Sequence, residues 1–80
     1  MNSSTWDTLR RIAADIFGQP PDTLAPDASP ETVETWDSVQ HLSLVLAIEE
    51  HFGVQIDPEE FEKMDSLGAI STLVETKLAR

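Results

Sequence analysis

Residues 36–53 are Trp-Asp-Ser-Val-Gln-His-Leu-Ser-Leu-Val-Leu-Ala-Ile-Glu-Glu-His-Phe-Gly, and this segment is the most informative about the fold. Within it, apolar side chains recur at the spacing of three and four that gives a helix one core-facing stripe: Leu44, Val45, Ile48 and Phe52. Asp37 is a good N-cap residue, and Gly53 suits the left-handed position that follows a helix. The pattern predicts a helix from about Asp37 to Phe52.

The opposite side of this helix is also partly apolar. Val39, Leu42 and Leu46 fall there, interleaved with Ser38, Glu49 and Glu50. A helix with two apolar sides is either enclosed in a core or carries an exposed partner-binding surface, and a domain of this size favours the second reading. We therefore expect Val39, Leu46, Glu49 and Glu50 to bind partners, with both glutamates facing solvent.

The flanking sequence adds further helices. Trp6, Leu9, Ala13, Ile16 and Phe17 predict a first helix that ends near Gly18. A long loop rich in proline follows from Gly18 to Trp36. Asp57-Pro58 opens a short third helix, and Leu67, Ile70, Leu73, Val74 and Leu78 predict a fourth. The fold class is all-α: a small four-helix bundle with three longer helices, a short third helix, and one domain over residues 1–80.

The charge distribution is strongly acidic. Fifteen acids face five bases for a net charge of −10, and residues 12–62 contain no Lys or Arg. Such a field repels nucleic acid and anionic membranes and attracts basic protein surfaces. Solubility of a small domain would explain the net charge equally well, so charge supports a basic partner without deciding for one.

Several classes of site are excluded. The chain has no Cys, and two His residues are too few for a zinc site, so we assign no metal and no thiolate nucleophile. No apolar run approaches the roughly 20 residues of a membrane span, and the N-terminus has no basic region followed by an apolar core. We expect a cytoplasmic protein without membrane insertion.

Asp37-Ser38-Val39 and Glu49-Glu50-His51-Phe52, in this order of elements, resemble the acyl carrier protein family over the whole chain. In that family an Asp-Ser-Leu motif opens the second helix, which ends in Glu-Glu-x-Phe. The resemblance implies a carrier-type bundle in which Ser38 takes 4′-phosphopantetheine from coenzyme A, with Asp37 as its motif neighbour.

The resemblance also implies a function. The chain would be a discrete carrier, a monomer and not an enzyme, whose added thiol holds acyl intermediates as thioesters. Its partners would be a phosphopantetheinyl transferase and the acyl-loading and processing enzymes of fatty-acid, polyketide or related biosynthesis, which have basic docking patches. The sequence departs from the family at Thr35, Val39, Gln40 and Ser43, where Gly, Leu and two acids are usual. Thr35 and Val39 remove no chemistry, and we expect the loss of acids at Gln40 and Ser43 to affect partner choice.

Alternatives remain for the two serine motifs. Asp65-Ser66-Leu67 matches the family tripeptide letter for letter, but only fourteen residues follow Ser66 and they lack the Glu-Glu-x-Phe ending. Asp37 and Ser38 alone would be read as an ordinary helix cap. An unmodified acidic helical adaptor that binds a basic partner is the competing function.

The neighbouring aromatic residues are interpreted structurally. We expect His41, on the core side of its helix, to be partly buried and hydrogen-bonded, and His51 to lie on the surface. We expect Trp36 to pin the long loop onto the bundle.

Overall fold

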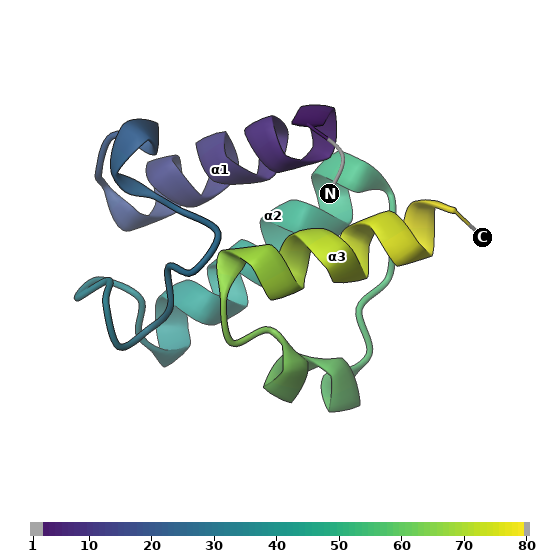
Figure 1. Cartoon of the computed structure of the whole chain (residues 1–80). Helices are drawn as coiled ribbons and strands as arrows, with labels where there is room; N and C mark the ends of the chain where they lie inside the picture. Colours follow the sequence, from purple (N-terminus) through teal and green to yellow (C-terminus); the bar gives the residue numbers. More distant parts are fainter. Residues whose placement is uncertain (1–2, 80) are drawn as a thin grey trace.

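The computed structural model describes residues 3–79, in which three α-helices are joined by two connections that each contain a 3-10 helix. The elements in chain order are α1 (Ser3–Phe17), η1 (Pro21–Thr23), α2 (Ser38–Phe52), η2 (Pro58–Lys63) and α3 (Leu67–Leu78). Figure 1 shows α2 crossing behind α1 and α3. Within residues 3–79 there is no strand, and no helix is long and apolar enough to cross a membrane. The predicted all-α bundle is confirmed, with η2 as its short third helix.

Helices α1 and α2 end at the residues before Gly18 and Gly53, as the sequence predicted. Gly18 and Gly53 have φ angles of 71° and 66°, the left-handed region that residues with a Cβ rarely adopt. The N–H of Gly53 donates to the carbonyl oxygen of Glu49 at 3.0 Å, and that of Gly18 to Ala14 at 2.9 Å. Each glycine therefore closes the last turn of its helix and lets the chain change direction.

The core lies where α1, α2 and α3 meet. Its largest apolar side chains with essentially no exposed surface come from every long helix, from the connection after α1 and from the end of η2: Leu9, Leu24, Leu44, Val45, Ile48, Met64, Leu67, Ile70 and Val74. Each such side chain contributes about 1.5–3 kcal/mol through burial. The stripe of α2 that contains Leu44, Val45 and Ile48 thus faces inward, and the opposite side of α2 remains outside.

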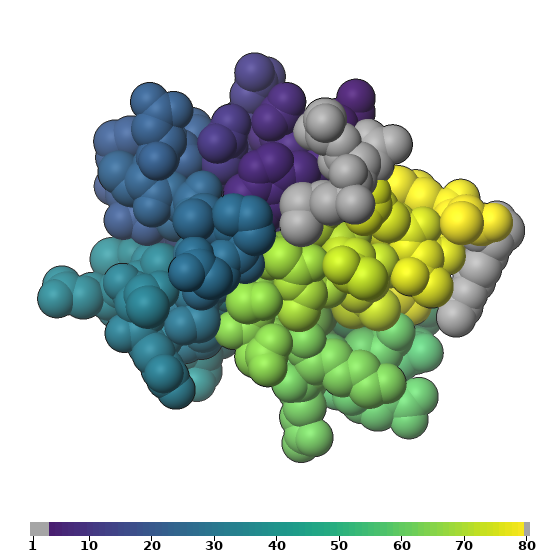
Figure 2. Space-filling view, in the orientation of Figure 1, coloured from purple at the N-terminus to yellow at the C-terminus, as the bar shows by residue number. Residues whose placement is uncertain are grey.

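The connection between α1 and α2 is ordered by contact with the start of α3. Leu24, Ala28 and Val33 are buried against the core. The N–H groups of Leu67 and Gly68 donate to the carbonyl oxygens of Ala28 at 3.0 Å and Pro26 at 2.7 Å. Figure 2 shows this blue segment lying directly against the green beginning of α3. These bonds hold the segment that leads to α2.

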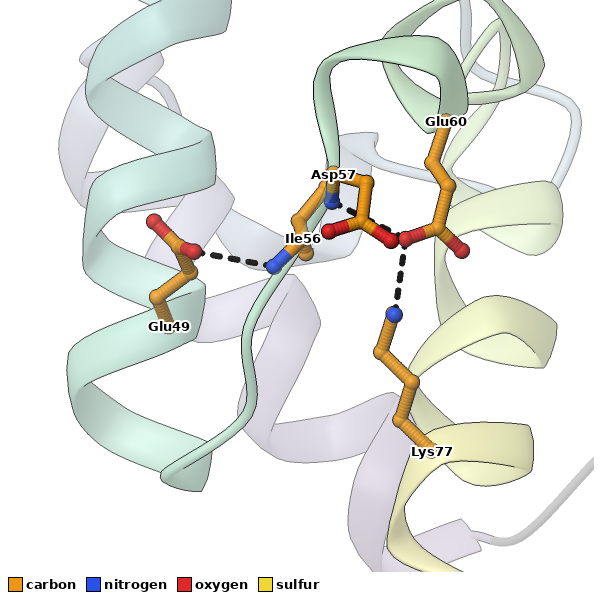
Figure 3. Close-up of polar contacts among 5 residues, drawn as sticks. All are labelled: Glu49, Ile56, Asp57, Glu60 and Lys77. Carbon is orange, nitrogen blue, oxygen red and sulfur yellow. Dashed lines mark hydrogen bonds and ion pairs between the residues drawn. The ribbon is translucent and has the colours of Figure 1, made fainter.

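The short helix η2 is joined to α3 by a mostly buried ion pair. The N–H of Asp57 donates to Glu60 Oε1 at 3.0 Å, a bond that runs from the cap residue to the side chain of the third helical residue. The same oxygen accepts from Lys77 Nζ at 2.7 Å, and the two side chains are only 15% and 9% exposed (Figure 3). One carboxylate therefore links the start of η2 to the last turn of α3.

Candidate functional site

Ser38 is the first residue of α2 and is exposed to solvent. Asp37 caps the helix, because its Oδ1 accepts from the N–H of Gln40 at 2.9 Å. In the part of the chain that the structure describes, no histidine or carboxylate hydrogen-bonds to the Ser38 hydroxyl. The positive end of the helix dipole lies at this position, which suits an attached anion. The geometry is that of a hydroxyl offered for modification rather than of an activated nucleophile.

A groove of about 620 Å³ opens beside Ser38. It is formed by the turn before α2, the first turn of α2 and η2, and its lining residues are Pro30, Trp36, Asp37, Ser38, His41, Leu42 and Phe61. One rim is polar, where Asp37 and Ser38 stand, and the wall is mainly aromatic and aliphatic. Pro30, Leu42 and Phe61 were not among the predicted site residues. Of these three, only Leu42 could have been assigned to the site from the sequence, because a helical wheel places it 40° from Ser38.

Trp36 and His41 form one wall of this groove. Trp36 is 3% exposed and packs on Phe17 with ring centroids 5.0 Å apart. Its indole Nε1–H donates to His41 Nδ1 at 3.0 Å. Burial lowers the pKa of His41 from its ordinary 6.5, against the raising effect of a hydrogen bond with the backbone of Phe61. The predicted roles of Trp36 in packing and of His41 as a partly buried, hydrogen-bonded ring are confirmed, and His51 is exposed as expected.

The outer face of α2 carries an apolar strip. Val39 is 71% exposed, Leu46 57% and Leu42 50%. Large aliphatic side chains exposed together on one helix mark a surface for association. The structure therefore places the predicted partner residues Val39 and Leu46 on the surface, with Leu42 between them along the chain and at the edge of the groove.

The two glutamates at the end of α2 have different environments. Glu50 is exposed, as predicted. Glu49 is half-buried, and its Oε2 accepts from the N–H of Ile56 at 2.9 Å (Figure 3). The expectation that Glu49 faces solvent is therefore wrong, because the chain after Gly53 folds back and uses this carboxylate to satisfy a backbone donor.

Ser66 has a structural role in its own motif. It is the N-cap of α3, and its Oγ accepts from the N–H of Ala69 at 3.1 Å. The residue is half-buried and the following Leu67 is completely buried. The hydroxyl of Ser66 is therefore engaged with α3, whereas that of Ser38 stands free on the surface.

The fold and the site together define a class of protein. The described bundle presents an exposed serine at the start of a partly apolar helix, and no base is bonded to that serine. Such an arrangement is suited to carrying a group that another protein attaches to the hydroxyl. The residues fit a phosphopantetheine group, because the helix N-terminus accommodates its phosphodiester and the adjoining groove offers apolar surface to its arm.

Comparisons with known proteins agree with this class. Residues 7–74 match the family model described as a phosphopantetheine attachment site. The chain is 31% identical over 77 residues to an acyl carrier protein from Thermosynechococcus vestitus, covering 96% of this chain and 95% of the relative. It is 33% identical over 76 residues to an acyl carrier protein from Zymomonas mobilis, covering 94% and 97%.

A solved structure supports the same assignment. The solution structure of the holo acyl carrier protein from Geobacter metallireducens is similar with a TM-score of 0.86 and 30% identity, covering 95% of this chain and 87% of that one. The chain belongs to the acyl carrier protein family. It is a carrier of acyl groups on covalently attached phosphopantetheine and not a catalyst, and the unmodified adaptor is not favoured. Proteins of this family are modified by a phosphopantetheinyl transferase and work with acyl-processing enzymes.

Proposed function

We propose that Ser38 is the residue to which phosphopantetheine is attached. The observation that carries this proposal is the contrast between two serines, each of which follows an aspartate. Ser38 is exposed at the first position of α2, beyond a cap supplied by Asp37. Ser66 is itself the cap of α3 and is hydrogen-bonded to Ala69. Modification of Ser66 would remove a helix cap, whereas modification of Ser38 leaves the cap of α2 in place.

The transfer step needs no base from this chain. Ser38 Oγ forms the new bond to the phosphorus that bears the pantetheine arm of coenzyme A, and the bond from that phosphorus to adenosine 3′,5′-bisphosphate breaks. The leaving nucleotide keeps the electron pair, and the hydroxyl proton passes to a base on the transferase. The positive end of the α2 dipole would stabilise the resulting phosphodiester anion. When bound, the group supplies the thiol that this cysteine-free chain lacks.

Intact-mass analysis after co-expression with a broad-specificity phosphopantetheinyl transferase tests the attachment point. We expect wild type to gain the mass of one phosphopantetheine group and Ser38→Ala to gain nothing. Ser66→Asp is the matched control, because Asp retains the capping function at that position but has no hydroxyl. The proposal would be refuted if Ser38→Ala still gained the mass. It would also be refuted if Ser66→Asp were the variant that failed to gain it.

The outer face of α2 is proposed as the docking surface for the transferase and for acyl-processing enzymes. Val39 and Leu46 supply exposed apolar contacts, and Glu50 supplies an exposed charge beside them. Glu49 adds its charge to this end of the helix while one of its oxygens is held by Ile56. Basic surfaces are drawn to such a face, and the apolar strip then gives the contact its area.

Kinetics of the transferase test the docking surface. We expect Glu50→Lys to lower kcat/KM about three- to tenfold at low ionic strength, with a smaller effect in high salt. Asp22→Lys changes the net charge equally but lies exposed on η1, outside α2, and serves as the control. Equal losses for the two variants would show that the effect is one of overall charge, and would contradict a docking surface on α2.

A further inference from the structure

A hydrogen bond between two side chains spans the segment that carries Ser38. Trp36 lies two residues before Ser38 and His41 three residues after it, and Trp36 Nε1–H donates to His41 Nδ1 at 3.0 Å. The two rings are nearly parallel, with an interplanar angle of 16° and centroids 6.0 Å apart. The bond therefore ties the turn before α2 to the first turn of α2, across the exposed serine.

The same pair packs against two other elements, α1 and η2. Trp36 packs on Phe17 of α1, and the rings of His41 and Phe61 of η2 make a T-shaped contact with centroids 6.2 Å apart. Trp36, His41 and Phe61 all line the groove beside Ser38. A change in the Trp36–His41 contact therefore changes both the turn that presents the serine and the wall of the groove.

The chemistry of this bond requires a neutral imidazole. An indole N–H can only donate, so His41 Nδ1 must offer a lone pair. Protonation of His41 would place an N–H on that nitrogen, facing the N–H of Trp36. Since Trp36 is 3% exposed, its N–H would lose its acceptor with little access to water, which is costly for a buried donor.

We propose that His41 is a positioning residue: in its neutral form it holds, through Trp36, the turn that presents Ser38 to the modifying enzyme, and its protonation releases that turn. The proposal rests on Ser38 being the attachment point, because only then does the position of this turn control modification. The imidazole has no role in the chemistry of transfer. It acts on the hydroxyl only through the backbone between residues 36 and 38.

The surroundings of His41 favour its neutral form at neutral pH. Burial is the largest cause of its lowered pKa, so release occurs below the ordinary value of 6.5. Charged side chains on the elements packed against His41 are those of the preceding turn and of η2: Glu34, Asp37, Glu59, Glu60, Glu62 and Lys63. Asp37 is engaged with Gln40, and Glu60 with Lys77.

Spectroscopy on the unmodified protein tests the contact directly. In a Trp6→Phe background, Trp36 is the one remaining indole. We expect its indole N–H resonance and its fluorescence to change together between pH 7.5 and 5, with a midpoint below 6.5 and without loss of helical circular dichroism. His41→Asn places an amide near Nδ1 that can accept a hydrogen bond but cannot titrate. It should retain the neutral-pH signals throughout the range.

Two further variants test whether the change in the Trp36 signals is caused by titration of His41 and not by another group. His51→Asn removes the exposed second histidine and should leave the transition unchanged. His41→Phe keeps a ring without an acceptor and should show the low-pH signals at every pH. A transition that persists in His41→Asn, or that disappears in His51→Asn, would overturn the proposal even if His41→Phe fails to fold.

The rate of modification completes the test. On acidification from pH 7.5 to 5.5, kcat/KM of wild type for the transferase should fall about three- to tenfold more than that of His41→Asn, a loss of the size of one hydrogen bond. Using the ratio cancels the pH dependence of the transferase itself. An unchanged ratio refutes the positioning role. A mass gain in Ser38→Ala would instead refute the attachment point, while the spectroscopic transition of Trp36 would stand.

Discussion

Gly68 lies at the second position of α3, where the loop from α1 presses against the helix. Its N–H donates to the carbonyl oxygen of Pro26 at 2.7 Å, beside the bond from Leu67 to Ala28. A Cβ added at Gly68 would stand 2.9 Å from that same oxygen and 3.4 Å from Pro26 Cβ. The obstacle is backbone, so Gly68→Ala cannot be accommodated by turning a flexible side chain.

The expected change in the free energy of unfolding of Gly68→Ala is the sum of opposing effects. In a helix without neighbours, Gly→Ala stabilises by about 1 kcal/mol. Here the inserted methyl group costs about 1–3 kcal/mol through overpacking. Displacement of Pro26 also weakens the bond from Gly68, which is worth about 0.5–1.5 kcal/mol. We expect a net loss of about 1–3 kcal/mol in the free energy of unfolding, opposite in sign to the helix propensity.

Urea unfolding followed by circular dichroism measures this difference. Thr76→Ala is the control, since Thr76 is exposed on the same helix and its hydroxyl donates to the carbonyl oxygen of Thr72. It should change stability by no more than about 0.5 kcal/mol. A Gly68→Ala variant as stable as wild type, or more stable, would refute the inference that the loop is pressed onto the start of α3.

Three other substitutions test separate parts of the structure. Asp37→Ala should lower the free energy of unfolding by about 1 kcal/mol in urea titrations, and Asp37→Asn by much less, because Asn also caps a helix. Lys77→Met should lower it by about 2–3 kcal/mol, since the Glu60 carboxylate is left mostly buried without its cation, and adding Glu60→Gln should recover part of that loss. His41 has a lowered pKa, so the unfolded chain binds its proton first on acidification. Its contribution to stability is therefore complete above about pH 7 and declines as the pH falls through its lowered pKa, and the wild-type minus His41→Asn difference measured from pH 7.5 to 5 should shrink accordingly.

Local signals in the sequence predicted the ends of the helices well. Asp37, Gly18 and Gly53 each act through their own backbone and nearest neighbours, so their roles could be inferred without knowing the fold. The bond from Asp57 to Glu60 is of the same kind, although the helix it opens is 3-10 rather than α. Interactions that span three or four residues are contained in the sequence pattern itself.

Contacts between distant segments could not be predicted in this way. The helical wheel placed Glu49 near Ser38 on the outer face, but it contains no information about Ile56, which comes back to use the carboxylate. The groove likewise needs Pro30 and Phe61, from two connections on either side of α2. The bond between Trp36 and His41 is an intermediate case. The partners are only five positions apart, but the turn of the chain between them decides whether they meet.

The apolar strip on α2 also bears on how the protein behaves toward its own copies. Val39, Leu42 and Leu46 would pair face to face in two neutral molecules, but each chain carries a net charge of −10, concentrated in a region without a single cation. Two like-charged surfaces repel within a Debye length, which is about 8 Å at physiological ionic strength and about 3 Å at 1 M salt. We expect crowding alone to leave the molecules apart and concentrated salt to bring them together through this strip. The acidic charge thus opposes self-association through the exposed apolar strip of α2 in a solution of identical chains.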